Sequence, residues 1–405
     1  MRIPPLRVAK RASSMTQAAG TAWELSDLAA RMALTDPEVI QLTVGDVDQD
    51  TPASVIEAGI ASLRAGRTHY APIAGDPEFR TAAAQACSER LERTVTSDRI
   101  VVFPGAQCAL FSVMQCVAEQ GDEVILLEPS YATYEAVVAA SGARAVRVSL
   151  RNDDGFKLDL ERLERAMSDR CRAVLLNSPN NPSGLLIAED ELHRLVELCR
   201  RRGVWIIADE VYARLTFERS HVSPLSLPGG EDCTVVIDSL SKSHAMTGWR
   251  IGWALAPPSL AAHLIDLAQA ELFSTPPFIQ DAAVVALRRE QGMAQTLRDI
   301  FRRRRDALLH GLRDCPGVRV FVPEGGMFVL ASVQALGMPS PQFARQLLEQ
   351  EKVAVIAGTA FGASVADTVR IGLTQPESRL LEAARRIRRF AEREILVPRG
   401  KSENI

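Results

Sequence analysis

Lysine is scarce in this chain. Of its 47 basic residues only five are lysines: Lys10, Lys157, Lys242, Lys352 and Lys401. Arginine and lysine serve about equally well on a solvated surface, so a lysine retained in an arginine-rich chain indicates a task that a guanidinium cannot perform. A lysine amine can lose its proton and form an imine with a carbonyl compound. Lys242 directly follows a short β-branched run and is the candidate; an exposed loop lysine is the simpler alternative.

Three further absences limit the class of protein. The seven cysteines are odd in number and form no Cys-x-x-Cys pair, which favours reduced thiols in the cytoplasm over a disulfide framework. No apolar run approaches the roughly 18 residues that cross a bilayer. The net charge of −3 implies no broad attraction to nucleic acid or anionic lipid. We therefore expect no nucleic acid, membrane or metal ion as a partner.

The first fourteen residues are basic and contain no acid, and Pro4-Pro5 interrupts any signal-peptide pattern. We expect a flexible or dimer-associated arm here, or sequence upstream of a start at Met15. A short organelle-targeting peptide is the alternative.

Short apolar runs alternate with amphipathic helical patterns between residues 98 and 255. Near-continuous apolar strands separated by helices are typical of an α/β domain whose mostly parallel sheet is covered on both faces. The seven predicted strands are 100–103, 123–127, 144–148, 173–176, 204–208, 234–237 and 251–254, and the clearest helices are 107–118 and 189–202.

From about residue 290 the pattern changes to that of a smaller α+β module. We expect an arginine-rich helix, two strands around Gly325-Gly326, two more strands and a final helix, with residues 15–45 packed on this module. The predicted organisation is 1–45 for the N-terminal arm and part of the small domain, 46–285 for the large domain, and 286–405 for the small C-terminal domain. The expected elements of the module are the helix 294–312, strands 318–322, 327–332, 353–356 and 368–373, and a helix beyond them.

Polar and small residues follow several strands, at the end where open parallel sheets bind ligands. Gly105, Ala106 and Gln107 open a helix after the first strand, and free N–H groups at a helix start suit a phosphate. Asn181 lies in a rigid proline-containing loop, where its amide could donate to a ligand oxygen. A tight turn and a well-capped turn are the respective alternatives.

The next two strands add a carboxylate, a phenol and an anion-binding pair. Asp209 and Tyr212 follow one strand, although capping a helix would be sufficient reason for the aspartate. Ser239 and Arg250 flank Lys242, and a hydroxyl with a guanidinium favours a phosphate. These groups converge on one edge of the sheet, and together they suit pyridoxal phosphate. The lysine would react with its aldehyde, the carboxylate would pair with its ring nitrogen, and the phenol would contact its ring oxygen.

The run from Ser239 to Trp253 resembles the cofactor-lysine signature of the fold type I, class I/II aminotransferases. Further motifs of that family match in order along the chain: Thr68-His69-Tyr70, Gly75–Arg80, Asn180–Gly184, Asp209–Tyr212 and Val369–Leu373. The resemblance implies the fold type I architecture, pyridoxal phosphate as cofactor, and transfer of an amino group from an L-amino acid to a 2-oxo acid.

The resemblance also implies roles by position. Lys242 would be the Schiff-base lysine and then the base that moves a proton, with Asp209 against the ring nitrogen. Tyr212 and Asn181 would contact the ring oxygen, and Tyr131 would stack on the ring. The resemblance further implies that the substrate is bound by Arg370, the Gly45 backbone and Asn181. The implied phosphate contacts are Gly105, Ala106, Gln107, Ser239, Arg250 and, from the second subunit of a homodimer, Tyr70.

The stretches 105–110 and 239–253 are most similar to arginine–pyruvate transaminases, which implies a cationic donor and pyruvate as acceptor. Glu24 and Asp27 are candidate partners for a guanidinium, and exposed helix acids are the alternative reading of both. The segment 44–52 departs from the family pattern, with Val47 and Gln49 where proline and phenylalanine are common, and this leaves the side-chain pocket open.

Several competing functions share parts of this pattern. Aminotransferases for aspartate, alanine or aromatic donors, and pyridoxal-phosphate-dependent carbon–sulfur lyases, carry the same motifs. Ser239-Leu240-Ser241-Lys242 matches the Ser-x-x-Lys motif of serine acyl enzymes, but the Lys-Thr-Gly motif that those enzymes need is absent. A regulator built on this fold would need a DNA-binding domain, which we do not expect in the short N-terminal arm.

Overall fold

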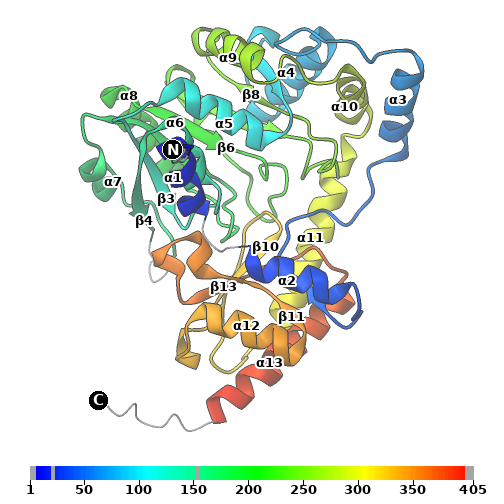
Figure 1. Ribbon diagram of the computed structural model, residues 1–405, viewed down its shortest axis with the longest axis vertical. Helices are drawn as coiled ribbons and strands as arrows, with labels where there is room; N and C mark the ends of the chain where they lie inside the picture. Colours follow the sequence, from blue (N-terminus) through cyan, green and yellow to red (C-terminus); the bar gives the residue numbers. More distant parts are fainter. Residues whose placement is uncertain (1–5, 20–22, 151–154, 397–405) are drawn as a thin grey trace, which may run out of the picture.

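A seven-stranded sheet organises the larger part of the molecule. The computed structural model describes residues 6–19, 23–150 and 155–396, and its main sheet has the order β2-β8-β7-β6-β5-β3-β4 (Figure 1). Strand β8 is antiparallel to both neighbours, and the other pairings are parallel. The bounds are β2 (Ile100–Phe103), β3 (Glu123–Glu128), β4 (Arg144–Ser149), β5 (Cys171–Asn177), β6 (Trp205–Asp209), β7 (Thr234–Ser239) and β8 (Gly252–Leu255). All seven predicted strands are confirmed, with ends shifted by no more than two residues.

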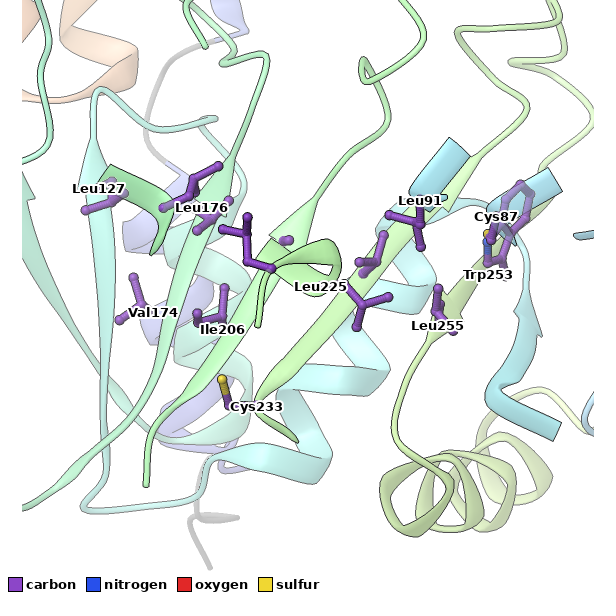
Figure 2. Packing of buried hydrophobic residues seen from close by; sticks show 14 of the residues in the cluster. Cys87, Leu91, Leu127, Val174, Leu176, Ile206, Leu225, Cys233, Trp253 and Leu255 are labelled. Carbon is purple, nitrogen blue, oxygen red and sulfur yellow. The ribbon is translucent and has the colours of Figure 1, made fainter. Parts of the chain in front are cut away.

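Helices cover both faces of this sheet, because its strands are apolar on both sides. Val101 and Phe103 of β2 belong to the core beneath α5, α6 and α9, whereas Ile100 and Val102 belong to the core on the opposite face. Figure 2 shows this second core, where Trp253 and Ile206 of the sheet lie in one layer with Cys87 of α4. The helices are α3 (Ala53–Arg64), α4 (Pro77–Leu91), α5 (Ala106–Val117), α6 (Tyr134–Ser141), α7 (Leu160–Ala166), α8 (Glu189–Arg202), α9 (Pro258–Glu271) and α10 (Pro277–Arg289).

The C-terminal part forms a smaller α+β unit with its own apolar core, as expected. Its antiparallel sheet has the order β12-β13-β10-β9, and a two-stranded parallel sheet joins β1 to β11. The strands are β1 (Ile40–Gln41), β9 (Arg319–Phe321), β10 (Phe328–Ser332), β11 (Val353–Ala354), β12 (Ile356–Ala357) and β13 (Thr368–Gly372), and the helices are α2 (Glu24–Ala33), α11 (Gly292–Gly311), α12 (Ser340–Glu351) and α13 (Glu377–Leu396).

The N-terminal segment is divided between the two parts of the molecule. Helix α1 (Lys10–Ala19) lies against α6 of the large sheet, although residues 10–14 were expected in an arm and the following ones on the smaller module. Helix α2 and strand β1 do join the smaller module, through β11. Residues 1–5 of the expected arm lie outside the described residues. The domain boundaries near residues 45 and 285 stay predictions.

Across the described ranges, none of the helices is long and apolar enough to traverse a bilayer.

Candidate active site

A cavity of about 250 Å³ lies at the carboxyl ends of β5, β6 and β7. The parallel register brings the last residues of neighbouring strands together, so that Asn177 pairs with Asp209. The small-domain strand β13 adds Arg370 from the other side. The cavity wall contains eleven of the thirteen predicted site residues: Gly45, Ala106, Gln107, Tyr131, Asn181, Asp209, Tyr212, Ser239, Lys242, Arg250 and Arg370.

Lys242 lies in the turn after β7, with its amine inside this cavity. Its Nζ donates a hydrogen bond to the carbonyl oxygen of Gly45 at 2.5 Å. Burial lowers the pKa of the Lys242 amine to about 8, while the charge of Asp46 opposes the shift and that of Arg250 adds to it. The neutral amine, which can act as nucleophile and base, is therefore accessible near neutral pH.

Asp209 ends β6 and is buried, with 8% of its surface exposed. The hydroxyl of Tyr134 donates to its Oδ2 at 2.7 Å, and the backbone N–H of Val211 lies 3.3 Å from Oδ1. Burial raises the pKa of Asp209 to about 6, and the hydrogen bond from Tyr134 acts in the opposite direction. Burial removes the water that would stabilise the charged carboxylate. A protonated ring nitrogen would stabilise that charge instead.

Arg370 is a buried guanidinium without a carboxylate partner among the described residues, with 1% of its surface exposed. Its Nη1 donates to Asn181 Oδ1 at 2.9 Å, its Nη2 donates to the carbonyl of Thr43, and its Nε has no partner. The guanidinium lies 4.0 Å from the centroid of the Phe328 ring. Burial lowers its pKa to about 10. A buried cation without an anionic partner is costly, so this guanidinium favours the binding of a carboxylate.

The start of α5 forms a cradle with Arg250. Gly105 precedes the helix at φ +84°, and a Cβ there would overlap the guanidinium of Arg250, so only glycine permits this approach. Gly252 of β8 is also close, because a Cβ on it would lie 2.7 Å from the N of Ala106. Free N–H groups, the hydroxyl of Ser239 and the guanidinium thus face one volume, which suits a phosphate.

Two predicted residues lie outside the cavity wall. Gly105 stands directly behind it, in the cradle. Tyr70 does not line the cavity of its own chain: it is 82% exposed and packs on Phe273, with 4.6 Å between ring centroids. Of the two acids considered for a guanidinium, Glu24 lines a neighbouring cavity, and Asp27 lines neither cavity.

Sequence reasoning missed several wall residues. Tyr134, the hydrogen-bond donor to Asp209, lies in a helix with no recognisable motif. Phe328 contacts Arg370 from β10, and Trp23 precedes α2, far from every other motif. No signal in a single sequence marks these positions, because only tertiary packing brings them to the site. The other wall residues outside the predicted set are Val44, Leu110, Asn177, Val211, Ser241 and Thr247.

The comparisons with known proteins decide the family. The family model for aminotransferases of class I and II matches residues 37–387. The chain belongs to this family. It is 45% identical to an arginine–pyruvate transaminase from Pseudomonas aeruginosa over 90% of its own length and 93% of that protein, and 31% identical to an aspartate aminotransferase from Bacillus subtilis over 96% and 100%. A solved aspartate aminotransferase from Thermus thermophilus superposes with a TM-score of 0.89 at 32% identity, covering 96% of this chain and 100% of the other.

This chain is therefore a transaminase of the family that uses pyridoxal phosphate, and its residues fit that cofactor. The glycine cradle beside Arg250 fits the phosphate, Asp209 fits the ring nitrogen, and Lys242 fits the aldehyde. When bound, the cofactor supplies a carbonyl for the amine and an electron-withdrawing ring that accepts the charge left on the substrate α-carbon.

The protein's own groups then control binding and the proton. Arg370 lines the same cavity as Lys242, and a substrate carboxylate bound by this guanidinium would place the substrate α-carbon within the cavity. The Lys242 amine, whose pKa burial lowers to about 8, would be the group of this cavity that takes and returns the α-proton. Asp209, whose charged form the hydrogen bond from Tyr134 favours, would supply the negative charge that a protonated ring nitrogen needs.

Proposed function

We propose that this aminotransferase moves the α-amino group of L-arginine to pyruvate, with pyridoxal phosphate held by the residues of the cavity. The observation that carries the general reaction is Arg370, a buried guanidinium with no acidic partner in the described part of the chain, 4.0 Å from the Phe328 ring. The similarity to the Pseudomonas transaminase supports arginine and pyruvate.

The reaction cavity itself argues against a dicarboxylic donor. Its only cations are Lys242, Arg250 and Arg370, counted over the residues that the structure describes. In the proposed assignment Lys242 reacts with the aldehyde, Arg250 binds the phosphate and Arg370 binds the α-carboxylate. No cation among the described residues of this cavity then remains for a second carboxylate of aspartate.

We also propose a homodimer in which Tyr70 of one subunit completes the phosphate site of the other. Tyr70 is exposed and does not line the cavity of its own subunit, and exposed Phe273, Leu63 and Ile56 offer apolar surface for association. The seven cysteines are free, which supports a reducing, cytoplasmic compartment.

The test is a half-reaction screen. The purified yellow holoenzyme is mixed with each L-amino acid in turn, and the loss of the imine absorbance is followed by stopped flow. We expect arginine to bleach the enzyme faster than aspartate, alanine or aromatic donors, and pyruvate to restore the colour. Indifference to arginine, with rapid bleaching by another amino acid, would refute the assigned donor while leaving the aminotransferase reaction intact.

A further inference from the structure

A second, larger cavity of about 880 Å³ adjoins the reaction cavity. The two share the wall residue Tyr131, and the consecutive residues Trp23 and Glu24 line the smaller and the larger cavity respectively. The larger cavity lies between the two parts of the molecule, because its wall combines α2, the end of β3 and η6 (Gly358–Phe361). The larger cavity therefore offers space for a long side chain next to the reaction cavity, on the other side of Tyr131.

Three carboxylates line this second cavity, and two of them are free of cationic partners. Glu135 is paired with Arg147. Glu24, at the start of α2, has no ion pair or side-chain hydrogen bond with any described residue. Glu128 is 3% exposed; its Oε2 accepts from Ser149 Oγ at 2.9 Å, and its Oε1 has no partner in the described chain.

The position of Glu128 depends on a glycine in the cavity wall. A Cβ at Gly362 would overlap the carboxylate of Glu128, so the acid reaches this wall only because residue 362 has no side chain. A buried carboxylate oxygen without a donor is costly, and such groups in native proteins commonly mark a bound ligand or water. The missing donor at Oε1 thus points to a cationic or N–H-rich ligand.

Two of the three arginines of the same wall are paired with other acids. Arg345 is paired with Glu349 of its own helix at 3.0 Å, and Arg147 is committed to Glu135. Arg31 lies seven residues beyond Glu24 on α2, which places it about 10 Å further along the helix axis. We call the part of the wall formed by the two unpaired carboxylates, Glu24 next to Trp23 and Glu128 at the end of β3, the acidic end of the cavity.

We propose that this acidic end, formed by Glu24 and Glu128 beside the rings of Trp23 and Tyr131, receives the guanidinium of the donor's side chain. The inference rests on the proposed function, because it presupposes a donor held at Arg370. Two carboxylates match the several N–H donors of a guanidinium, and its flat face stacks on aromatic rings better than an ammonium does. Glu24 and Glu128 are thus specificity-determining residues rather than catalytic ones.

The test compares L-arginine with L-citrulline, whose ureido group is the neutral counterpart of the guanidinium. The holoenzyme and the variants Glu24→Gln and Glu128→Gln are assayed in the half-reaction with both donors. We expect the ratio of kcat/KM for arginine to that for citrulline to fall about 5-fold in Glu24→Gln, which removes an exposed charge. In Glu128→Gln the expected fall is about 30-fold, because the charge lost there is buried.

Asp27→Asn is the matched control, since it removes an acid one turn further along α2 that lines neither cavity. We expect it to keep the wild-type ratio. A wild-type ratio in both glutamate variants, or an equal fall in the control, would overturn the proposal even if arginine is the preferred donor.

A second measurement separates this inference from the proposed donor. Butylguanidine, which carries no amino-acid head group and cannot be transaminated, is tested as an inhibitor of the half-reaction with alanine. Inhibition that Glu24→Gln weakens supports the cavity assignment, including in an enzyme that prefers another donor. Absence of inhibition overturns it.

Discussion

At the scale of single residues, the contact between Tyr134 and Asp209 is the most informative one that the sequence did not reveal. Asp209 could be found from its place after an apolar strand. Its donor Tyr134 lies 75 positions earlier, at the start of α6, and reaches the carboxylate only in the folded chain. The ring of Tyr134 also packs edge-on against Tyr131, with 5.6 Å between centroids. One residue thus orients both the carboxylate and the predicted stacking ring.

Replacing Tyr134 by phenylalanine should shift the pH dependence of cofactor binding. The pKa of Asp209 is about 6 with the hydrogen bond present, and loss of a donor to the charged form raises it further. Because the carboxylate must be ionised to hold a protonated ring nitrogen, affinity is present above this pKa and is lost as the pH falls through it. We expect the midpoint of that loss in apoenzyme titrations with pyridoxal phosphate to move up by about one pH unit in Tyr134→Phe.

Tyr131→Phe is the control for this titration, because Tyr131 also presents a phenol to the cavity but makes no hydrogen bond to Asp209. Superimposable profiles for wild type and Tyr134→Phe would show that the hydrogen bond does not govern the ionisation of Asp209.

At the scale of elements, the start of α5 depends on one glycine. Gly105 has a positive φ and stands against the guanidinium of Arg250. The Gly105→Ala substitution should displace Arg250 and weaken pyridoxal phosphate binding by about 10-fold or more, since it disturbs a charge-assisted contact worth at least 1.4 kcal/mol. Equilibrium titration of the apoenzyme measures this change.

Gly203→Ala is the control for that experiment. It places alanine at a positive φ, as Gly105→Ala does, but without a steric clash. Gly203 ends α8 at φ +64°, and a Cβ there meets nothing within 4 Å. We expect this variant to lose about 1 kcal/mol of stability, seen as a lower Tm, with unchanged cofactor affinity. Equal cofactor loss in both alanine variants would contradict a specific cradle at residue 105.

The regular elements were predictable where a periodic apolar pattern alone decides the conformation. The large-sheet strands are buried on both faces, so their apolar runs are unambiguous, and helix α8 was predicted with its observed ends. The predicted strand 353–356 instead divides into β11 and β12, because β11 pairs with β1 and β12 pairs with β13. The two-residue strand β1 exists only through that partner, and no local pattern could reveal it.

At the scale of the whole molecule, the segment after β1 connects the two parts through the site. Arg304 of α11, 5% exposed, forms a two-pronged ion pair with Asp48, both contacts at 2.7 Å. Asp46 accepts from Thr247 at 2.6 Å, next to the lysine turn. Two acids, Asp46 and Asp48, therefore anchor the segment that departs from the family pattern at Val47 and Gln49.

Subunit mixing tests the proposed shared site at this scale. Lys242→Ala and Tyr70→Ala homodimers should each be strongly impaired, the first without transamination and the second with weak phosphate binding. If Tyr70 acts across the dimer, a mixed dimer has one site with both residues intact, so unfolding and refolding the two together should restore activity well above either parent. Light scattering would confirm the dimer, and no recovery on mixing would place Tyr70 outside the partner's site.

The sequence alone determined the α/β layering, the strand ends where ligands bind, and most groups of the reaction site, including Lys242, Asp209 and Arg370. Lys242 and Asp209 could be found because apolar runs specify buried strands, and strand ends place the following residues at one edge of the sheet, whereas Arg370 was identified only through the resemblance to the aminotransferases. Only the tertiary structure decided which side chains complete the site. Tyr134, Trp23 and the unpaired carboxylate of Glu128 acquire their meaning from neighbours distant in sequence, since burial and missing hydrogen-bond partners are properties of the packed chain.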